Sequence, residues 1–251
     1  MKIAICFSGQ PRTWKKCFPR LIEKIGNDSV DVFFHFWDYN TLPSIVTSLF
    51  GKQIQDELLA DQEKLEIIQT MQPKNYLFES RKSVKYWNCS IPISDQLGPW
   101  CTEQYYSRYY VSLLKREYEI KHDFLYDLVI WSRADLWITD ETLLNIQTPS
   151  PNTIYTPGIS WDNTYGVFRI GDIFYYADSY TSDQLAEIFK FFSYVPASWV
   201  TCEKTPPPEV AFYLYLASIG IFNAPIYGNF KLMRTETFSE LKGTLDGYET
   251  R

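Results

Sequence analysis

The amino-acid sequence predicts an α/β protein with a mostly parallel central sheet flanked by helices. Three apolar runs have the length and continuity of buried strands, at residues 3–7, 30–38 and 127–132. Segments with helical spacing lie between them, so strands and helices alternate through the first half of the chain. This alternation favours a parallel sheet with helices on both faces. The second half mixes the two kinds of element less regularly.

The first half begins with the strand over 3–7, which ends in Ser8-Gly9-Gln10-Pro11-Arg12. Gly9 permits a tight turn, and Pro11 can open the following helix, which we expect to run to about Ile25. After the second strand, apolar residues close to helical spacing predict a helix that Pro73 ends: Ile54, Leu58, Leu65, Ile68 and Met71. Tyr76-Leu77-Phe78 predicts a short third strand.

The remaining elements follow from the same patterns. Residues 81–100 lack periodicity and are predicted to be a loop, and a long helix over 102–120 leads into the strand over 127–132. We then expect strands over 153–156 and 172–176, a helix over 182–192, a loop over 193–208, a helix over 209–219 and a strand over 221–226. No linker or repeat divides the chain, so we expect a single domain over 1–251 that ends in a tail over 236–251.

Composition excludes some classes of protein. A net charge of −6 and a sequence pI of about 5.1 argue against a nucleic-acid-binding protein, so any anionic ligand must meet local cations. Five scattered cysteines without CxxC spacing give no zinc or redox signature, and reduced thiols fit a cytoplasmic location. No apolar run approaches membrane-spanning length. We therefore expect a soluble protein without a transmembrane segment.

Polar residues gather where the predicted strands end, which is where ligands bind in open α/β sheets. The first cluster is the segment 8–12. A glycine turn that leads into a helix N-terminus presents N–H groups to an anion, and Arg12 adds a planar fork suited to phosphate. The segment matches neither GxGxxG nor a Walker loop. An ordinary turn between a strand and a helix is the alternative.

Two further clusters end the second strand and the strand over 127–132. In the segment 35–38, Trp37 could stack on a base and Asp38 could accept hydrogen bonds from a ribose or a base edge. The alternative is that His35 and Trp37 are core residues. In Arg133-Ala134-Asp135, the carboxylate could bind a divalent cation and Arg133 could pair with a diphosphate. A structural salt bridge is the alternative there.

Taken in order, these clusters resemble a family of glycosyltransferase-like proteins from viruses and bacterial surface-polysaccharide gene sets. The resemblance spans about residues 3 to 225 and rests on five landmarks. They are Ser-Gly-Gln-x-Arg at 8–12, Val-Asp-Val-Phe-x-His-x-Trp-Asp at 30–38, Gln-x-x-Ser at 104–107, Tyr-Asp-Leu-Val-Ile-x-x-Arg-x-Asp-Leu at 126–136, and Pro208-Glu209 with Gly220-Ile221.

The resemblance implies a GT-A-type, Rossmann-like nucleotide-diphosphosugar transferase, with a nucleotide-sugar half at about 1–138 and an acceptor half at about 139–235. It places seven residues beside Asp135 at the UDP or GDP sugar: Ser8, Gly9, Gln10, Arg12, Trp37, Asp38 and Arg133. Such enzymes usually hold Mn²⁺ or Mg²⁺ with Asp-x-Asp. Here Arg133 replaces the first acid, so the resemblance offers only Asp135 as a metal ligand.

The acceptor would be a hydroxyl of a glycan or glycoconjugate, and an inverting transferase needs a general base beside it. Asp172 and Glu209 are the preferred acids among Asp162, Asp172, Asp178 and Glu209, although an acid in the first turn of a helix also complements the helix dipole. Trp161, Tyr165 and Trp199 lie in predicted loops where aromatic rings could stack on a sugar. A viral protein of this kind would act in the host cytoplasm.

Two other functions stay open at this point. The missing first acid also fits a non-catalytic protein that binds nucleotide sugars with the same fold, and a more distant possibility is a phosphotransferase or nucleotidyltransferase. The donor sugar and base, the acceptor, the stereochemical outcome and the oligomeric state are not encoded in any pattern of the sequence.

Overall fold

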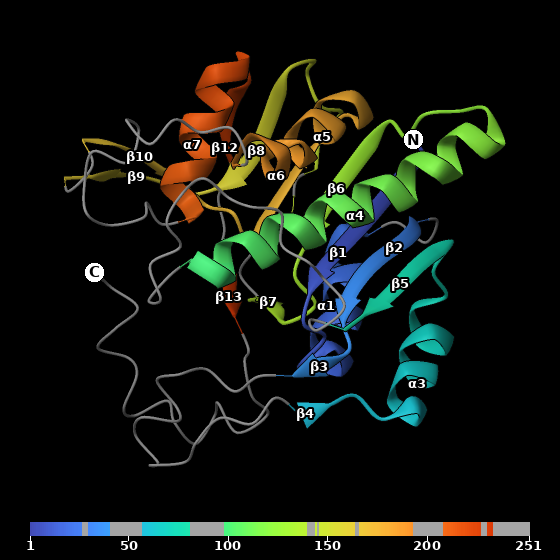
Figure 1. Ribbon diagram of the computed structural model, residues 1–251. Helices are drawn as coiled ribbons and strands as arrows, with labels where there is room; N and C mark the ends of the chain where they lie inside the picture. Colours follow the sequence, from blue (N-terminus) through green and yellow to red (C-terminus); the bar gives the residue numbers. More distant parts are fainter. Residues whose placement is uncertain are drawn as a thin grey trace, which may run out of the picture.

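A seven-stranded sheet forms the centre of the protein (Figure 1). The computed structural model describes residues 1–26, 30–40, 57–80, 98–139, 144, 146–163, 166–192, 208–226 and 230–232. The strand order is β12-β8-β11-β6-β1-β2-β5. Their bounds are β1 Ile3–Gly9, β2 Val30–Trp37, β5 Asn75–Glu79, β6 Leu128–Ser132, β8 Thr153–Pro157, β11 Phe174–Ala177 and β12 Phe222–Ile226. Only β11 runs antiparallel to its neighbours, so the prediction of a mostly parallel sheet is confirmed.

Helices cover both faces of this sheet. α1 (Trp14–Ile25) and α3 (Asp61–Met71) pack on one face, against the side chains of Ile3, Ile5 and Phe7. The other face carries α4 (Gly98–His122), α5 (Ser179–Ala186), α6 (Ile188–Phe192) and α7 (Pro208–Ile219). Because side chains alternate along a strand, Ala4 and Cys6 of β1 face this second layer. Figure 1 shows α4 running along the sheet across β1, β2 and β6.

Three two-stranded sheets lie outside the central one. They pair β3 (Tyr39–Asn40) with β4 (Glu57–Leu58), β7 (Leu136–Ile138) with β13 (Phe230–Leu232), and β9 (Ile159–Asp162) with β10 (Val167–Ile170). The sequence did not predict these pairs. Each strand has four residues or fewer, which is too short to show a period of two above the background of the chain.

Several helix boundaries differ from the predicted ones. α1 begins at Trp14 rather than at Pro11, because the Pro11 carbonyl already accepts the Trp14 N–H in a turn. The single helix predicted over 182–192 is two helices, α5 and α6, and α5 begins earlier, at Ser179. The Asp178 side chain caps α5 by accepting the Thr181 N–H. α3 begins only at Asp61, and α4 begins at Gly98, inside the predicted loop over 81–100.

Some predictions fall on residues that the structure does not describe. They concern the loop residues 81–97 and 193–207, the tail at 236–251, and Ile54. In the described part of the chain, no helix is both long and apolar enough to span a membrane.

The strand order brings the predicted polar clusters to one edge of the sheet. From β1, the chain continues to β2 and β5 on one side of the sheet and later returns to β6 on the other side of β1. The strand order therefore reverses between β1 and β6. In doubly wound α/β sheets a ligand binds at this switch point, beyond the carboxyl ends of the strands. β11 is antiparallel to β6 and therefore begins at this same edge, with Phe174 opposite Ser132.

Candidate functional site

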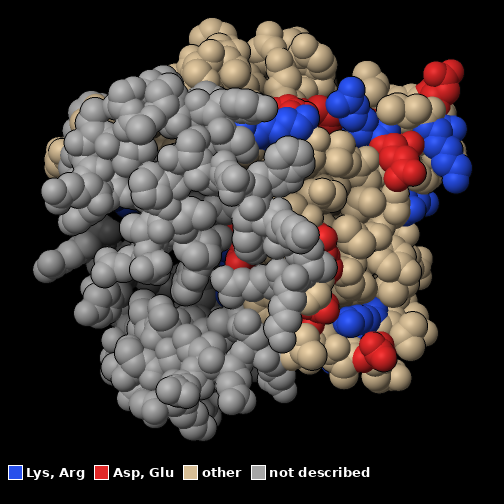
Figure 2. Space-filling view, viewed as in Figure 1, with Lys and Arg blue, Asp and Glu red and all other residues tan. Residues whose placement is uncertain are grey.

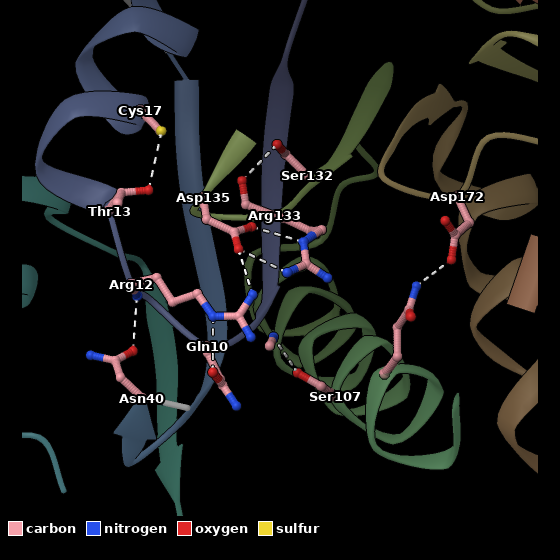
Figure 3. A network of polar contacts seen from close by, with 12 residues as sticks. Gln10, Arg12, Thr13, Cys17, Asn40, Ser107, Ser132, Arg133, Asp135 and Asp172 are labelled. Atoms are coloured by element: carbon pink, nitrogen blue, oxygen red, sulfur yellow. Dashed lines mark hydrogen bonds and ion pairs between the residues drawn. The ribbon is translucent and has the colours of Figure 1, made fainter. Parts of the chain in front are cut away.

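Two arginines and one aspartate meet at the switch point between β1 and β6 (Figure 3). Arg12 follows β1, while Arg133 and Asp135 follow β6. The Nε and Nη2 of Arg133 donate to Oδ1 and Oδ2 of Asp135, each at 2.8 Å. The Nη1 of Arg12 donates to Oδ2 of the same carboxylate, also at 2.8 Å. One carboxylate therefore holds two guanidinium groups, which is the core of the candidate site.

The cluster carries a net positive charge that reaches the surface. The Asp135 side chain is 0% exposed, whereas those of Arg12 and Arg133 are 14% and 23% exposed. Burial alone would raise the pKa of Asp135, but the two guanidiniums lower it to about 2, so the carboxylate is ionised. Two cations and one anion leave one positive charge. On the face seen in Figure 2, the described charges of both signs are interspersed.

The backbone after β1 turns sharply to send the Arg12 side chain toward Asp135. Gly9 has φ of 100°, a conformation that residues with a Cβ atom rarely adopt. Arg12 itself has φ of 42°, in the left-handed region. Its N–H donates to Asn40 Oδ1 at 3.0 Å, and its Nε donates to Gln10 Oε1 at 3.0 Å. Strained backbone held by such contacts is common at functional sites, and here it positions a cation.

A buried network from α4 supports the same turn. Ser107 Oγ accepts the Gly9 N–H at 2.8 Å and donates to the His35 carbonyl at 2.9 Å. The His35 ring lies between Ser107 and Glu79, with Nδ1 at 2.9 Å from Ser107 Oγ and Nε2 at 2.8 Å from Glu79 Oε2. Burial opposes ionisation of Glu79, but hydrogen bonds from His35 and Tyr106 lower its pKa. His35 is thus a satisfied core histidine, one of the two alternatives that the sequence offered.

Asp172 and its partners form a second cluster at the start of β11. Two side chains of α4 contact Asp172. Gln104 Nε2 donates to its Oδ2. Arg108 Nη2 donates to its carbonyl oxygen and also lies 3.4 Å from Oδ2. Asp172 acts electrostatically on both Arg133 and Glu209. Arg133 and Glu209 are therefore both within electrostatic range of Asp172.

Close backbone packing places Asp172 there. A Cβ atom on Gly171 would collide with the carbonyl oxygen of Pro157, so only glycine lets this segment lie against β8. The Gly171 N–H donates to the Gly158 carbonyl at 3.3 Å. The prediction that Asp172 begins a strand was wrong by two residues, because β11 begins at Phe174. Asp172 therefore lies in the connection that reaches the site edge.

Glu209 is the more available of the two candidate bases. It is half-buried in the first turn of α7, and burial together with the negative charge of Asp172 raises its pKa. Arg169 and Arg108 oppose this shift without cancelling it. A raised pKa makes a carboxylate a better proton acceptor.

The two residues predicted to hold the nucleoside differ in their surroundings. Trp37 is 2% exposed and stacks on Tyr106, with ring centroids 5.6 Å apart, as core filling would require. Asp38, directly after β2, is half-buried, and its Oδ1 is shielded from solvent without a hydrogen-bond partner in the described part of the chain. Such an acceptor can be satisfied by a ligand hydroxyl.

The structure thus brings Arg12, Arg133 and Asp135 together at one edge, and Asp172 acts electrostatically on both Arg133 and Glu209. Sequence reasoning gave no role to four residues that position these groups: Asn40, Glu79, Gln104 and Arg108. The Gln-x-x-Ser spacing at 104–107 was the available signal, since it places both polar side chains one helical turn apart.

Other predicted residues do not enter this site. Asp178 caps α5 by accepting the Thr181 N–H at 2.7 Å, which is a structural role. Tyr165 and Trp199, and the side chains of Trp161 and Asp162, lie outside what the structure describes.

The GT-A resemblance implies Mn²⁺ or Mg²⁺ bound to Asp135, but the residues present do not fit such an ion in this arrangement. Both oxygens of the carboxylate already accept hydrogen bonds from arginines, and its side chain is fully buried. The adjacent side chains are cations, whereas Mg²⁺ and Mn²⁺ prefer oxygen ligands. Among the described residues, no group of three or more His, Cys, Asp and Glu could hold a metal ion.

Comparison with known proteins finds a distant likeness to solved structures. No protein-family model matches the chain, and no curated protein does. A solved structure of a glycosyltransferase involved in the glycosylation of the major capsid of PBCV-1 superposes with a TM-score of 0.41 at 12% sequence identity. The match covers 90% of this chain and 82% of that chain. So loose a likeness carries no argument about activity, which we take from the site alone.

Proposed function

We propose that this protein is a glycosyltransferase that moves a sugar from a nucleotide-diphosphosugar donor to a hydroxyl of a glycan or glycoconjugate. The observation that carries the proposal is the two-arginine cluster at the switch point of the sheet. Planar guanidinium groups bind phosphate oxygens in a bidentate manner. A diphosphate bound there would place its nucleoside over the ends of β1 and β2 and its sugar toward Asp172 and Glu209.

The nucleoside side is supported by Asp38. Its shielded and unpartnered Oδ1 would accept a hydrogen bond from a ribose hydroxyl or a base N–H. Ser8 and Gly9 end β1, and Gln10 follows them toward α1, which begins at Trp14 and whose N-terminal dipole favours an anion. Trp37 would form a wall of this region and not an exposed stacking platform, because its ring is buried.

The transfer step needs a base and a stabilised leaving group. In a direct displacement, the acceptor hydroxyl oxygen bonds to the anomeric carbon, the bond from that carbon to the diphosphate oxygen breaks, and the hydroxyl proton passes to Glu209. The nucleoside diphosphate leaves with the bonding electron pair, and Arg12 and Arg133 stabilise its added negative charge. Asp172 is the weaker candidate for the base, since Gln104 and Arg108 already occupy its Oδ2.

Release of nucleoside diphosphate from a panel of UDP and GDP sugars, with glycan acceptors, tests this proposal. Glu209→Gln should lower kcat about 100-fold or more and leave donor affinity unchanged, since a positioned base contributes about that factor. Glu66→Gln, which removes an acid on α3 whose side chain is 45% exposed, is the matched control and should behave as wild type.

Two results would count against the proposal in different ways. Donor binding without turnover on any acceptor would favour the non-catalytic nucleotide-sugar-binding protein, for which the sequestered Asp135 is the supporting observation. If no sugar nucleotide raises Tm, both the transferase and the non-catalytic binding protein are ruled out. Saturation at about 100 times Kd should stabilise the fold by roughly 2.7 kcal/mol.

A further inference from the structure

We infer that the protein neutralises the donor diphosphate with Arg12 and Arg133 in place of a divalent cation, and that Asp135 is a positioning residue that holds these two arginines. The inference rests on the proposed function, because it concerns how the donor is bound. It assigns Asp135 a task different from the one its place in the sequence suggests, since an acid after this strand is expected to ligate metal.

Both oxygens of the Asp135 carboxylate already accept hydrogen bonds from arginine. Asp135 accepts three charge-assisted hydrogen bonds at 2.8 Å, from two different side chains, and has no exposed surface. Mg²⁺ and Mn²⁺ would have to approach with some of their water shell. To reach an oxygen of Asp135, the ion would displace a guanidinium from a buried partner and then lie beside it as a second cation.

Arg12 and Arg133 each keep hydrogen-bond donors that Asp135 and Gln10 do not use. Within the described part of the chain, the Nη2 of Arg12 and the Nη1 of Arg133 make no hydrogen bond. Both side chains are partly exposed, at 14% and 23%. Each guanidinium therefore keeps one NH₂ group for phosphate oxygens while its other nitrogens are fixed. This arrangement binds an anion without having to rearrange first.

The charge of the cluster is opposite to that of the diphosphate. Two arginines and Asp135 sum to one positive charge, and a sugar nucleotide brings a diphosphate of about two negative charges. The leaving nucleoside diphosphate is more negative still, so the cluster favours the products of bond cleavage electrostatically. Asp135 lowers the charge of the cluster, but without it the two guanidiniums would repel each other. The burial and mutual repulsion that act on Arg12 are visible in its lowered pKa.

Binding measured with and without metal separates the two roles of Asp135. We would titrate the full chain with UDP, GDP and inorganic pyrophosphate by calorimetry, in excess EDTA and in saturating Mn²⁺. If the arginines act in place of a cation, Kd differs by less than about threefold between the two conditions. Electron paramagnetic resonance of Mn²⁺ should show no immobilised ion, with or without nucleotide.

Variants then assign the binding to individual side chains. Arg133→Ala and Arg12→Ala should each weaken nucleoside diphosphate binding in EDTA about tenfold or more, the value of one charge-assisted hydrogen bond. Arg116→Ala removes an exposed arginine in the second half of α4 and is the matched control, with unchanged Kd. Asp135→Asn keeps one acceptor oxygen and raises the net charge of the cluster to two. It should bind pyrophosphate in EDTA at least as well as wild type and lose kcat, because the arginines are no longer fixed.

The outcomes are distinct. Binding that requires Mn²⁺ in the wild-type protein, or an immobilised Mn²⁺ signal that Asp135→Asn abolishes, would overturn the inference and leave the proposed function standing. If neither nucleoside diphosphates nor sugar nucleotides bind in either condition, the proposed function fails and the inference with it. The wild-type comparison needs no variant, so the inference stays testable even if Asp135→Asn does not fold.

Discussion

Acid should weaken the folded state through Asp135, and Asp135→Asn should remove that part of the pH dependence. Burial by itself would raise the pKa of this carboxyl group, but Arg133 and Arg12 lower it from 3.8 to about 2. A carboxyl group whose pKa is lower in the folded than in the unfolded chain stabilises folding above its unfolded pKa. That stability is lost as the pH falls through the folded pKa. The window therefore runs from about pH 4 down to about pH 2.

The size of the effect follows from the same two values. A change from 3.8 to about 2 corresponds to ~2 kcal/mol of stability at neutral pH. By about pH 3 the carboxyl group is mostly protonated in the unfolded chain but still ionised in the folded one, so roughly 1 kcal/mol of this has gone. Urea unfolding followed by tryptophan fluorescence, at several values between about pH 6 and pH 3, measures the free energy of unfolding directly.

The comparison of two stability curves is what decides. Asp135→Asn should be less stable than wild type by ~2 kcal/mol or more at about pH 6, and the gap should narrow by roughly 1 kcal/mol by about pH 3. Asp61→Asn is the control, because the Asp61 side chain is 98% exposed, and its curve should run parallel to that of wild type. Parallel curves for wild type and Asp135→Asn over the whole range would show that the arginines do not stabilise the ionised carboxylate.

Three further predictions concern the framework of the site. Lys115→Met should destabilise the fold by about 3–5 kcal/mol, because it leaves Glu119 and Asp183, at 2.8 and 3.0 Å from the buried ammonium, without their partner. Lys190→Met, at an exposed pair with Glu187, should cost less than about 1 kcal/mol, and equal losses in urea unfolding would contradict this view of the buried cation. Ser107→Ala should cost about 1–3 kcal/mol and weaken donor binding as well, since the partly buried Gly9 N–H loses its acceptor; unchanged donor affinity would separate this network from the site. Gly171→Ala should lower both Tm and kcat through the clash with Pro157, and a variant with wild-type kcat would show that Asp172 need not stay in place.

The sequence places the candidate site at one edge of the sheet because the positions of strand ends can be predicted from local patterns. The strands predicted over 3–7, 30–38 and 127–132 correspond to β1, β2 and β6, which end at Gly9, Trp37 and Ser132. Because these strands are parallel, the polar residues that follow them lie at one edge of the sheet. Alternation along β2 also bears on Trp37. It places residues 33, 35 and 37 on the face that α4 covers, which accounts for the burial of Trp37 against Tyr106.

The pairing of Arg12 with Asp135 could not be predicted in the same way. These residues are 123 positions apart, and their contact depends on the left-handed turn at Arg12 and on the register of β1 with β6. A pattern of residue types says that a cation and a carboxylate share an edge. It does not say that both oxygens of the carboxylate are already taken. The same holds for Asp172, whose partners Gln104 and Arg108 lie on a helix that begins in the predicted loop.

Asp135 is what allows two guanidinium groups to stand side by side at the switch point. Gln10 and Asp135 are the only side chains to which Arg12 donates in the described part of the chain, and Asp135 is the only one for Arg133. If the carboxylate were given to a metal ion, both cations would lose their charged partner at the place where the ion adds two more positive charges. The existing arrangement has the opposite consequence: the anion is fully buried, and the two cations are partly exposed. In the proposed transfer, a diphosphate would meet donors already in place, and these donors would act most strongly as it leaves the sugar.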